Sequence, residues 1–443
     1  MMKRSTRREF ALSASVAAAM VQVTSAQTEK GVIKPAGTSM IPGGRDLDPV
    51  KWTRDRYQSA PLRLTFRATT LTEAETWQRE LRTKLMELLG GFPERTPLQA
   101  EVLDVRQYSG YRRERILFHS RPGVAVIGYL LIPEGRKAPH ATVIAIPGHG
   151  RGVDDIVGID EYGHDRTDKP GYQHDFAIQA VEHGLATLAI EPMAFGYRRN
   201  ELIAAKGPNE TACQPVAGSA LLFGETMIGW RVWDVMRSID WISTRSDLDS
   251  HRIGCMGISG GGTCTLFSAA LDLRIKAAFV SGYLNTFRDS IMSVPHCMDN
   301  YVPGILNWAE NYDVAGLIAP RPLFSEGGDQ DPIFPVSATR ESYARVKKVY
   351  EVFGAALKCN KKFSRGDTSS MECAACHSWW KLWADKRTAF RHHEGSSHRA
   401  TSTFAHHNCS GVPPHSAGCT SATDCEKVHV WPAASSALYW RSP

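Results

Sequence analysis

Between about residue 140 and residue 330, two kinds of segment alternate along the chain, and they differ in the spacing of their apolar residues. Short, continuous apolar runs of the kind that forms strands buried on both faces occur at residues 141–146, 186–190, 253–256, 277–281 and 322–326. Apolar residues recur at helical spacing between these runs, at residues 176–183, 226–244 and 262–271. This alternation predicts an α/β fold, with a mostly parallel, doubly wound sheet that carries helices on both faces.

The residues before this core predict a helix and a hairpin. An apolar stripe that includes Trp77 and Leu81 predicts a helix at residues 72–89, which two glycines then end. Residues 115–119 and 124–132 are predicted to form two strands joined by a tight turn. The segment before the helix is rich in proline, glycine and polar residues, and we expect it to be a loosely packed lead-in.

The first residues have the pattern of an export signal. Arg7 and Arg8 form a twin-arginine pair, followed by a modest apolar stretch at residues 11–23 and small residues at 24–26. We therefore expect the twin-arginine export machinery to carry the folded chain to the periplasm or the extracellular space, with the mature protein beginning near Gln27. A basic, alanine-rich helix is the alternative.

Composition narrows the class of protein. The chain is 42% hydrophobic and 22% charged, as in a soluble globular protein, and no apolar run reaches the length of a membrane span. A net charge of +6 is small for 443 residues, so we expect no nucleic-acid partner. Few cysteines precede Ala356, which predicts a fold held by its core and not by disulfides. They are Cys213, Cys255, Cys264 and Cys297.

Gly-Ile-Ser-Gly-Gly at residues 257–261 matches the pattern G-x-S-x-G. It follows one apolar run directly and opens the next predicted helix, which is the strand, sharp turn and helix of a nucleophile elbow. A side chain at Gly257 or Gly261 would clash across such a turn. We predict Ser259 as the nucleophile, with the N–H of Gly260 directed into the same space; an ordinary glycine-rich turn is the alternative.

Pro-Gly-His-Gly at residues 147–150 ends the apolar run at 141–146. Small residues let the backbone N–H groups of such a loop approach a developing negative charge. We therefore predict that His149 and Gly150 complete an oxyanion hole with Gly260. The ring of His149 is an alternative catalytic base, which we disfavour because a triad histidine usually follows the acid along the chain.

The predicted acid lies after the last strand. Residues 327–335 follow that strand, and within them Asp331 precedes a proline in a compact turn that would fix its carboxylate toward a histidine. Asp329 is the rival for this role. A calcium-binding acidic turn is the alternative to both.

Several motifs in the same order resemble bacterial acetyl-xylan-esterase and dienelactone-hydrolase-like α/β hydrolases, from about residue 77 to 356. Besides the elbow and the Pro-Gly-His-Gly loop they are His-Cys at 296–297, Tyr-Val-Pro-Gly at 301–304, Ile-Ala-Pro-Arg-Pro at 318–322 and Asp-Pro-Ile-Phe-Pro at 331–335. The resemblance implies cleavage of a carbohydrate or other small-molecule ester. A histidine would deprotonate Ser259, an acyl-enzyme would form, and water would release the acid. It implies no metal and no organic cofactor.

The pattern breaks after Ala356. The resembling family places Gly-Gly-His-Glu-Phe soon after the acid, and that motif is missing here. Residues 357–443 contain no isoleucine, six cysteines and half of all histidines, and their strand and helix spacing vanishes. Cys-Ala-Ala-Cys-His at 373–377 matches a haem c attachment pattern, although no methionine follows His377 as an axial ligand. A metal could also be bound by the tail histidines His392, His393, His398, His406 and His407.

A shifted reading frame near residues 356–357 explains the tail better. Suppose that each codon is rebuilt from the last base of one printed codon and the first two bases of the next. The codons of residues 363–372 can then encode the sequence Phe-Pro-Gly-Gly-His-Glu-Phe-His-Gly. A stop is permitted at residues 385–386. The family motif thus returns in its expected place. We therefore divide the chain into a signal at 1–26, a lead-in at 27–100, the hydrolase core at 101–356 and an out-of-frame tail at 357–443.

These observations predict an exported serine hydrolase that cleaves carboxylic esters. A hydrolase-like protein that is inactive as printed, because its catalytic histidine is missing, is one alternative. A hydrolase fused to a C-terminal haem- or metal-binding segment is the other.

Overall fold

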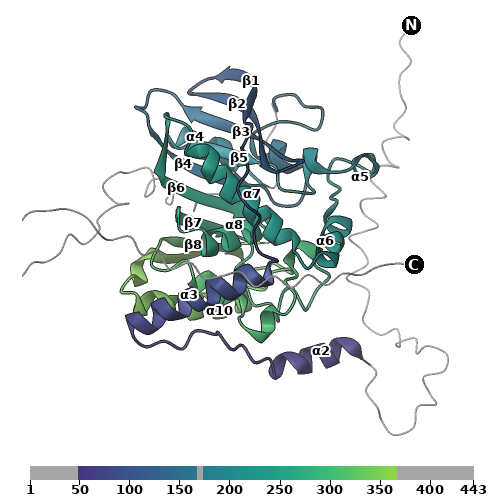
Figure 1. Cartoon of the computed structure of the whole chain (residues 1–443), viewed down its shortest axis with the longest axis vertical. Coiled ribbons are helices and arrows are strands. Elements are labelled where there is room, and N and C mark those ends of the chain that lie inside the picture. Colours follow the sequence, from purple (N-terminus) through teal and green to yellow (C-terminus); the bar gives the residue numbers. More distant parts are fainter. Residues whose placement is uncertain (1–47, 167–172, 367–443) are drawn as a thin grey trace, which may run out of the picture. The chain divides into compact units, whose positions relative to one another are not determined.

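The computed structural model describes residues 48–166 and 173–366 (Figure 1). Within these residues one nine-stranded sheet has the order β1-β2-β3-β5-β4-β6-β7-β8-β9. The strands are β1 (Glu101–Tyr108), β2 (Tyr111–Arg121), β3 (Val124–Pro133), β4 (His140–Ile146), β5 (Ala186–Ile190), β6 (Leu248–Ile258), β7 (Ile275–Ser281), β8 (Leu323–Gly328) and β9 (Cys359–Ser364). From β5 to β9 all neighbouring strands are parallel, whereas the pairs β1–β2, β2–β3 and β3–β5 are antiparallel. The predicted α/β fold class, with a mostly parallel sheet, is confirmed.

Helices lie on both faces of this sheet, because side chains along each central strand alternate between two hydrophobic clusters. In β4, Ile144 and Ile146 pack with α3, α7, α8, α9 and α10, whereas Val143 and Ala145 pack with α4. The helices are α2 (Pro49–Gln58), α3 (Leu71–Leu88), α4 (Phe176–Glu182), α5 (Glu201–Ala204), α6 (Cys213–Leu222), α7 (Met227–Ile242), α8 (Gly260–Leu271), α9 (Asn311–Gly316) and α10 (Val336–Val352).

Helix α3 shows how the sequence sets these elements. Thr70 caps its first turn in a reciprocal capping box with Glu73. Trp77 and Leu81 then repeat on one face and are buried in the core. The predicted helix at residues 72–89 is therefore confirmed, as are the hairpin strands and the five apolar runs, which form β2 to β8.

Both ends of the core contain an element that no run of apolar residues marks. The lead-in contains α2, which Asp48 caps and which begins with proline, and none of its residues is buried, in keeping with a loosely packed lead-in. After Ala356, where the apolar spacing vanishes, β9 adds an edge strand to β8, with Cys359 opposite Leu323. An edge strand is held by backbone hydrogen bonds and can leave most side chains in water, so its sequence needs no apolar run.

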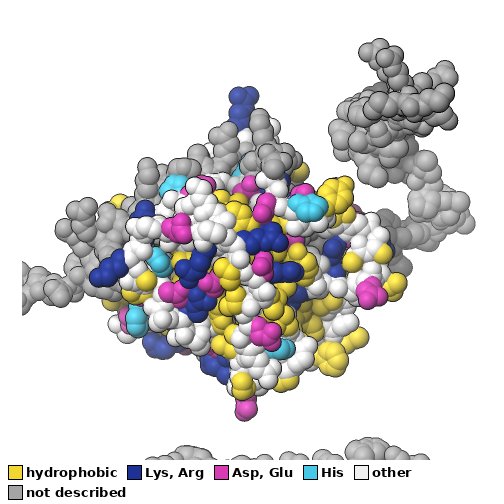
Figure 2. Space-filling model, turned by 90° about the horizontal axis from the view of Figure 1, so that it is seen from above, with side chains coloured by type: hydrophobic (Ala, Val, Ile, Leu, Met, Phe, Trp, Pro, Cys, Tyr) yellow, Lys and Arg dark blue, Asp and Glu magenta, His cyan; other side chains and the backbone are white. Residues whose placement is uncertain are grey.

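No helix in the two described ranges is long and apolar enough to cross a membrane. Figure 2 views the molecule from above Figure 1, toward the edge where β1 lies, and basic and acidic side chains are interspersed there around hydrophobic patches. That face is not the one-sided basic surface that nucleic acids bind.

Candidate active site

Ser259 lies between β6 and α8 in a strained backbone conformation, with φ 53° and ψ −119°. Its N–H donates to the carbonyl oxygen of Ser281 at the end of β7 at 2.9 Å. Its own carbonyl oxygen accepts from the N–H of Thr263 at 2.9 Å and so begins α8. This is the geometry of a nucleophile elbow, and Ser259 is partly exposed at its tip while Gly260 is buried.

The glycines of the motif are required by close backbone contacts. A Cβ on Gly257 would lie 2.3 Å from the carbonyl oxygen of Gly261, and one on Gly261 would lie 2.0 Å from that of Ile146. The predicted clash across the turn is therefore confirmed.

The loop at residues 147–150 lies beside the elbow, because β4 and β6 are neighbours with Ile146 opposite Gly257. The N–H of Gly148 donates to the buried side-chain oxygen of Gln173 at 2.6 Å, which anchors the loop. The N–H groups of His149 and Gly150, which were predicted as oxyanion donors, follow directly after this anchored residue. The ring of His149 packs against the elbow, since a Cβ on Gly260 would be 2.8 Å from His149 Nδ1.

The two candidate acids have different surroundings after β8. Asp331 is buried, and its Oδ1 accepts the N–H groups of Ile333 and Phe334 at 2.8 and 2.9 Å in the compact turn that was predicted. Asp329 is exposed, and its Oδ1 accepts the N–H of Gly366 at 2.7 Å. Asp329 therefore holds the chain that follows β9, whereas Asp331 is the carboxylate enclosed at the sheet edge.

The described part of the tail reaches Gly366 and includes β9, and residues 367–443 lie outside it. The haem-like residues 373–377 and the tail histidines His392, His393, His398, His406 and His407 lie outside the described residues, as does the predicted signal at residues 1–26.

Sequence reasoning missed a polar cluster behind the oxyanion loop. His149 Nε2 lies 3.7 Å from Cys213 Sγ and 3.8 Å from Asp299 Oδ2. Asp299 is fully buried and forms an ion pair with Arg231, whose guanidinium also donates to Cys213 at 3.3 Å. Cys297 lies within hydrogen-bonding distance of Cys213. No short motif links these residues, which come from four separate segments.

Hydrogen bonds and neighbouring charges shift the pKa values of Cys213, His149 and Asp299 in this cluster. The hydrogen bond from Cys297 lowers the pKa of Cys213, and the charge of Arg231 lowers it further. Burial alone would lower the pKa of His149, but the contacts with Cys213 and Asp299 outweigh it and raise that pKa. Desolvation would raise the pKa of Asp299, but Arg231 and His149 keep it low.

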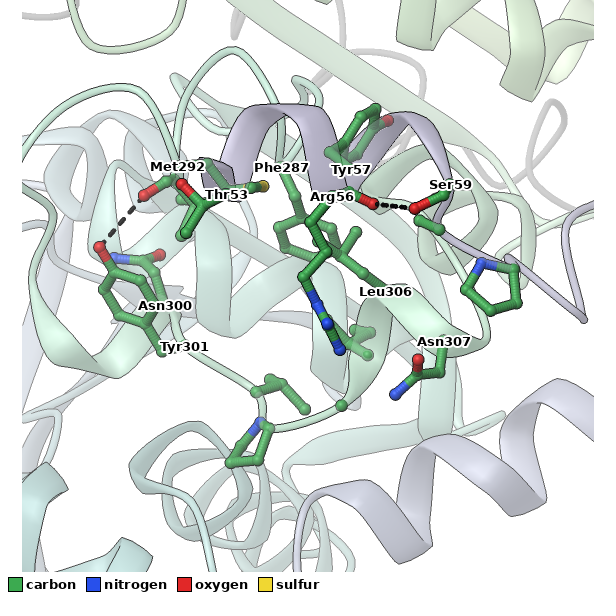
Figure 3. A pocket seen from close by; sticks show the side chains of 17 residues that line it. Thr53, Arg56, Tyr57, Ser59, Phe287, Met292, Asn300, Tyr301, Leu306 and Asn307 are labelled. Carbon is green, nitrogen blue, oxygen red and sulfur yellow. Dashed lines mark hydrogen bonds between the residues drawn. The ribbon is translucent and has the colours of Figure 1, made fainter. Parts of the chain in front are cut away.

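A cavity of about 590 Å³ lies between α2 and the segment at residues 287–307 (Figure 3). Such a volume suits a small-molecule ligand. Its wall includes Asn300, whose Oδ1 accepts from the hydroxyl of Thr263 at 3.0 Å, in the first turn after Ser259. The lining is mostly apolar, with the side chain of Arg56 directed inward, and includes Thr53, Tyr57, Phe287, Met292, Tyr301 and Leu306.

Residues 58–345, well over half of the chain, match the Abhydrolase family. The chain belongs to the Abhydrolase family. The resemblance predicted from the motifs is therefore confirmed, and the protein is an α/β hydrolase.

Relatives of this Abhydrolase protein agree with that assignment. YtaP of Bacillus subtilis strain 168, described as a hydrolase, is 27% identical over 286 residues, which cover 62% of this chain and 89% of YtaP. A Bacteroides fragilis structure described as an acetyl xylan esterase has a TM-score of 0.62 and 20% identity, and covers 74% of this chain and 84% of its own. A glucuronoyl esterase from Solibacter usitatus has a TM-score of 0.51 and 14% identity, with 72% and 94% covered. At these identities the two structures establish the shared fold alone.

Proposed function

We propose that this Abhydrolase protein is a serine esterase that forms an acyl-enzyme on Ser259. The observation that carries the proposal is the strained serine between β6 and α8, with the loop of the adjacent strand β4 beside it. N–H groups of Gly260, His149 and Gly150 would stabilise the oxyanion, and removal of one such donor typically costs about 10²- to 10³-fold in rate. Asp331 would orient the histidine that deprotonates Ser259.

The base would come from the chain that follows β9. Strand β9 runs parallel to β8, and Gly366 beyond it donates to Asp329, two residues before the proposed acid. In the shifted frame the histidine of Gly-Gly-His is read from the codons of residues 367 and 368, directly after Gly366. A histidine at that position would follow Asp331 along the chain, in the order acid then base.

The proposed substrate is an acetylated carbohydrate or another small ester. The two structural relatives named above are described as an acetyl xylan esterase and a glucuronoyl esterase, which favours this class. Asn300 lines the cavity and accepts a hydrogen bond from Thr263 in the first turn of α8, which favours the cavity as the place for the part of the substrate beyond the ester.

The nucleophile is tested with Ser259→Ala in a chain whose frame is restored. Turnover of p-nitrophenyl acetate and of acetylated xylan should fall about 10⁶-fold, to the level left by the oxyanion hole and binding alone. Labelling by a fluorophosphonate should also disappear, whereas Ser219→Ala, at an exposed serine of α6, should leave both unchanged. Near-normal activity and labelling in Ser259→Ala would refute the assignment.

We further propose export by the twin-arginine route, on the strength of Arg7 and Arg8. The double change Arg7→Lys and Arg8→Lys should retain the precursor in the cytoplasm, and Arg4→Lys is the matched control. Equal periplasmic amounts of both variants on fractionation would contradict this route.

A further inference from the structure

We propose that His149, Cys213, Cys297 and Asp299 form a binding site for a structural zinc ion. Each of the four residues offers one donor atom, and these atoms all lie within 4.8 Å of one another. This departs from the expectation of no metal that the sequence resemblance implied. The proposal does not depend on the esterase assignment, because it concerns metal content and not turnover.

The spacing of the donor atoms fits tetrahedral zinc. Zinc bonds to thiolate sulfur at about 2.3 Å and to imidazole nitrogen or carboxylate oxygen at about 2.0–2.2 Å, so ligand atoms around it lie about 3.3–3.8 Å apart. The contacts of His149 Nε2 with Cys213 Sγ at 3.7 Å and with Asp299 Oδ2 at 3.8 Å already have that separation. Two sulfurs, one nitrogen and one oxygen are also a donor set that zinc prefers over calcium or magnesium.

Arg231 is buried and paired with Asp299, and its positive charge taken alone would repel a cation. In the complete site, however, the charge of Arg231 is needed for neutrality. Two thiolates and one carboxylate carry three negative charges, and zinc with the guanidinium carries three positive charges, so the buried site is neutral. Arg231 would then act as the hydrogen-bonding partner that orients two of the ligands, Asp299 and Cys213.

The surroundings fit a closed site that has an entry path. Cys213 and Asp299 are buried, whereas Cys297 is half-buried and the His149 side chain is 31% exposed, so an ion would enter on their side. The ring of Phe195 packs on both His149 and Arg231 and shields the cluster. Zinc held there would tie the loop of His149 to α6 and to the turn at Asp299, and so fix the loop beside Gly260.

The test measures metal in the full-length chain with its frame restored, which keeps all four ligands because they precede Ala356. The protein is incubated with zinc sulfate, desalted and analysed by plasma mass spectrometry, and we expect one zinc per chain. Cobalt(II) in its place should give thiolate-to-cobalt charge-transfer absorption in the near ultraviolet and the intense visible bands of tetrahedral cobalt. Cys297→Ser and Cys213→Ser should each lose both signals, whereas Cys255→Ala, at a buried cysteine outside the cluster, should keep them.

Circular dichroism of each variant shows whether it is folded. The cobalt spectrum of the unchanged chain tests the site even if a variant fails to fold. Three results would overturn the proposal: free thiols with no retained metal, a Cys213–Cys297 disulfide found by mass spectrometry of the non-reduced protein, or equal zinc in the Cys297→Ser and unchanged chains.

Discussion

Gly261 lies against the end of β4 so closely that a Cβ on it would be 2.0 Å from the carbonyl oxygen of Ile146. The first turn of α8 is thereby pressed onto the strand that leads into the oxyanion loop. The position of Ser259 relative to that loop thus depends on a contact in which no side chain takes part.

We expect Gly261→Ala to destabilise the protein by about 3 kcal/mol or more, because the obstructing atoms are backbone and cannot turn aside. Esterase activity should fall with it, since the elbow must move away from the loop. Gly218→Ala is the control, because a Cβ there meets nothing within 4 Å in helix α6 and should be neutral or slightly stabilising. Urea unfolding of both variants measures the difference, and equal midpoints would contradict the packing argument.

Asp331→Asn should reduce kcat/KM far more than Asp329→Asn. A buried carboxylate that orients a histidine is worth up to about 10⁴-fold in kcat in the best-studied serine hydrolase triad. Asp329 holds the backbone of Gly366, so its loss should cost stability before it costs catalysis. Both variants are assayed on the same acetyl ester in the restored frame, and the reverse ranking would assign the acid to Asp329.

Arg56→Ala should weaken the binding of carbohydrate esters without affecting p-nitrophenyl acetate, which is too small to reach α2. The guanidinium points into the cavity, and the loss of a hydrogen bond to this charged group, worth about 1.5–3 kcal/mol, should raise KM about tenfold or more. Arg54→Ala, on the same helix but outside the lining, is the matched control. An equal effect of Arg56→Ala on both substrates would exclude the cavity as a substrate site.

Glu191 makes stability depend on pH. Burial raises its pKa to about 8, although the N–H groups of Val153 and Tyr197 and the charge of Arg198 act against that rise. Between the ordinary value of 4.5 and about 8, the folded protein therefore binds a proton that the unfolded chain does not. The stability this provides is complete below about pH 4.5 and is lost as the pH rises through 8.

Glu191→Gln should therefore flatten the fall in unfolding free energy between pH 5 and about 8.5, by on the order of a few kcal/mol. Urea titrations at a series of pH values measure it, with the exposed Glu201→Gln as control. An unchanged slope in Glu191→Gln would show that the carboxylate is ionised in the folded protein at all of these pH values.

The central sheet could be predicted from the sequence because its strands are buried on both faces. All residues of β4 and β5 are buried, so apolar runs mark them directly. Strand β1 was missed because all but one of its residues are exposed, and no periodic apolar pattern remains. The strand β9 was missed for the same reason, since Cys359 is its one fully buried residue.

The elbow was predictable because a local turn leaves a local sequence motif. The cluster of His149, Cys213, Arg231 and Asp299 was not, because loop, helix and turn segments separated by up to 150 residues meet there through the tertiary fold. Ser259, Asp331 and the oxyanion donors stay predictions of role, although the geometry of each favours it.

We expect residues 357–443 to affect both the activity and the solubility of the chain. As printed, the chain lacks the histidine motif that follows β9 in the resembling family, and without a base the hydroxyl of Ser259 is too weakly acidic to attack an ester at neutral pH. The helical spacing of apolar residues that would mark a closing helix also vanishes after Ala356, so apolar surface on one face of the sheet should stay exposed. The printed chain should therefore show background activity and aggregate.

Restoring the frame near Ala356 should give a protein that ends about where Asp385 now stands, elutes as a single species and hydrolyses acetyl esters. Both versions are expressed side by side and compared by size-exclusion chromatography and by kcat/KM. Replacing the histidine of the restored Gly-Gly-His with alanine should return activity to background without loss of solubility, which separates the base from the closing helix. A printed chain that is monodisperse and fully active would refute the shifted frame, and the base would then have to be sought at His377, His392, His393 or His398.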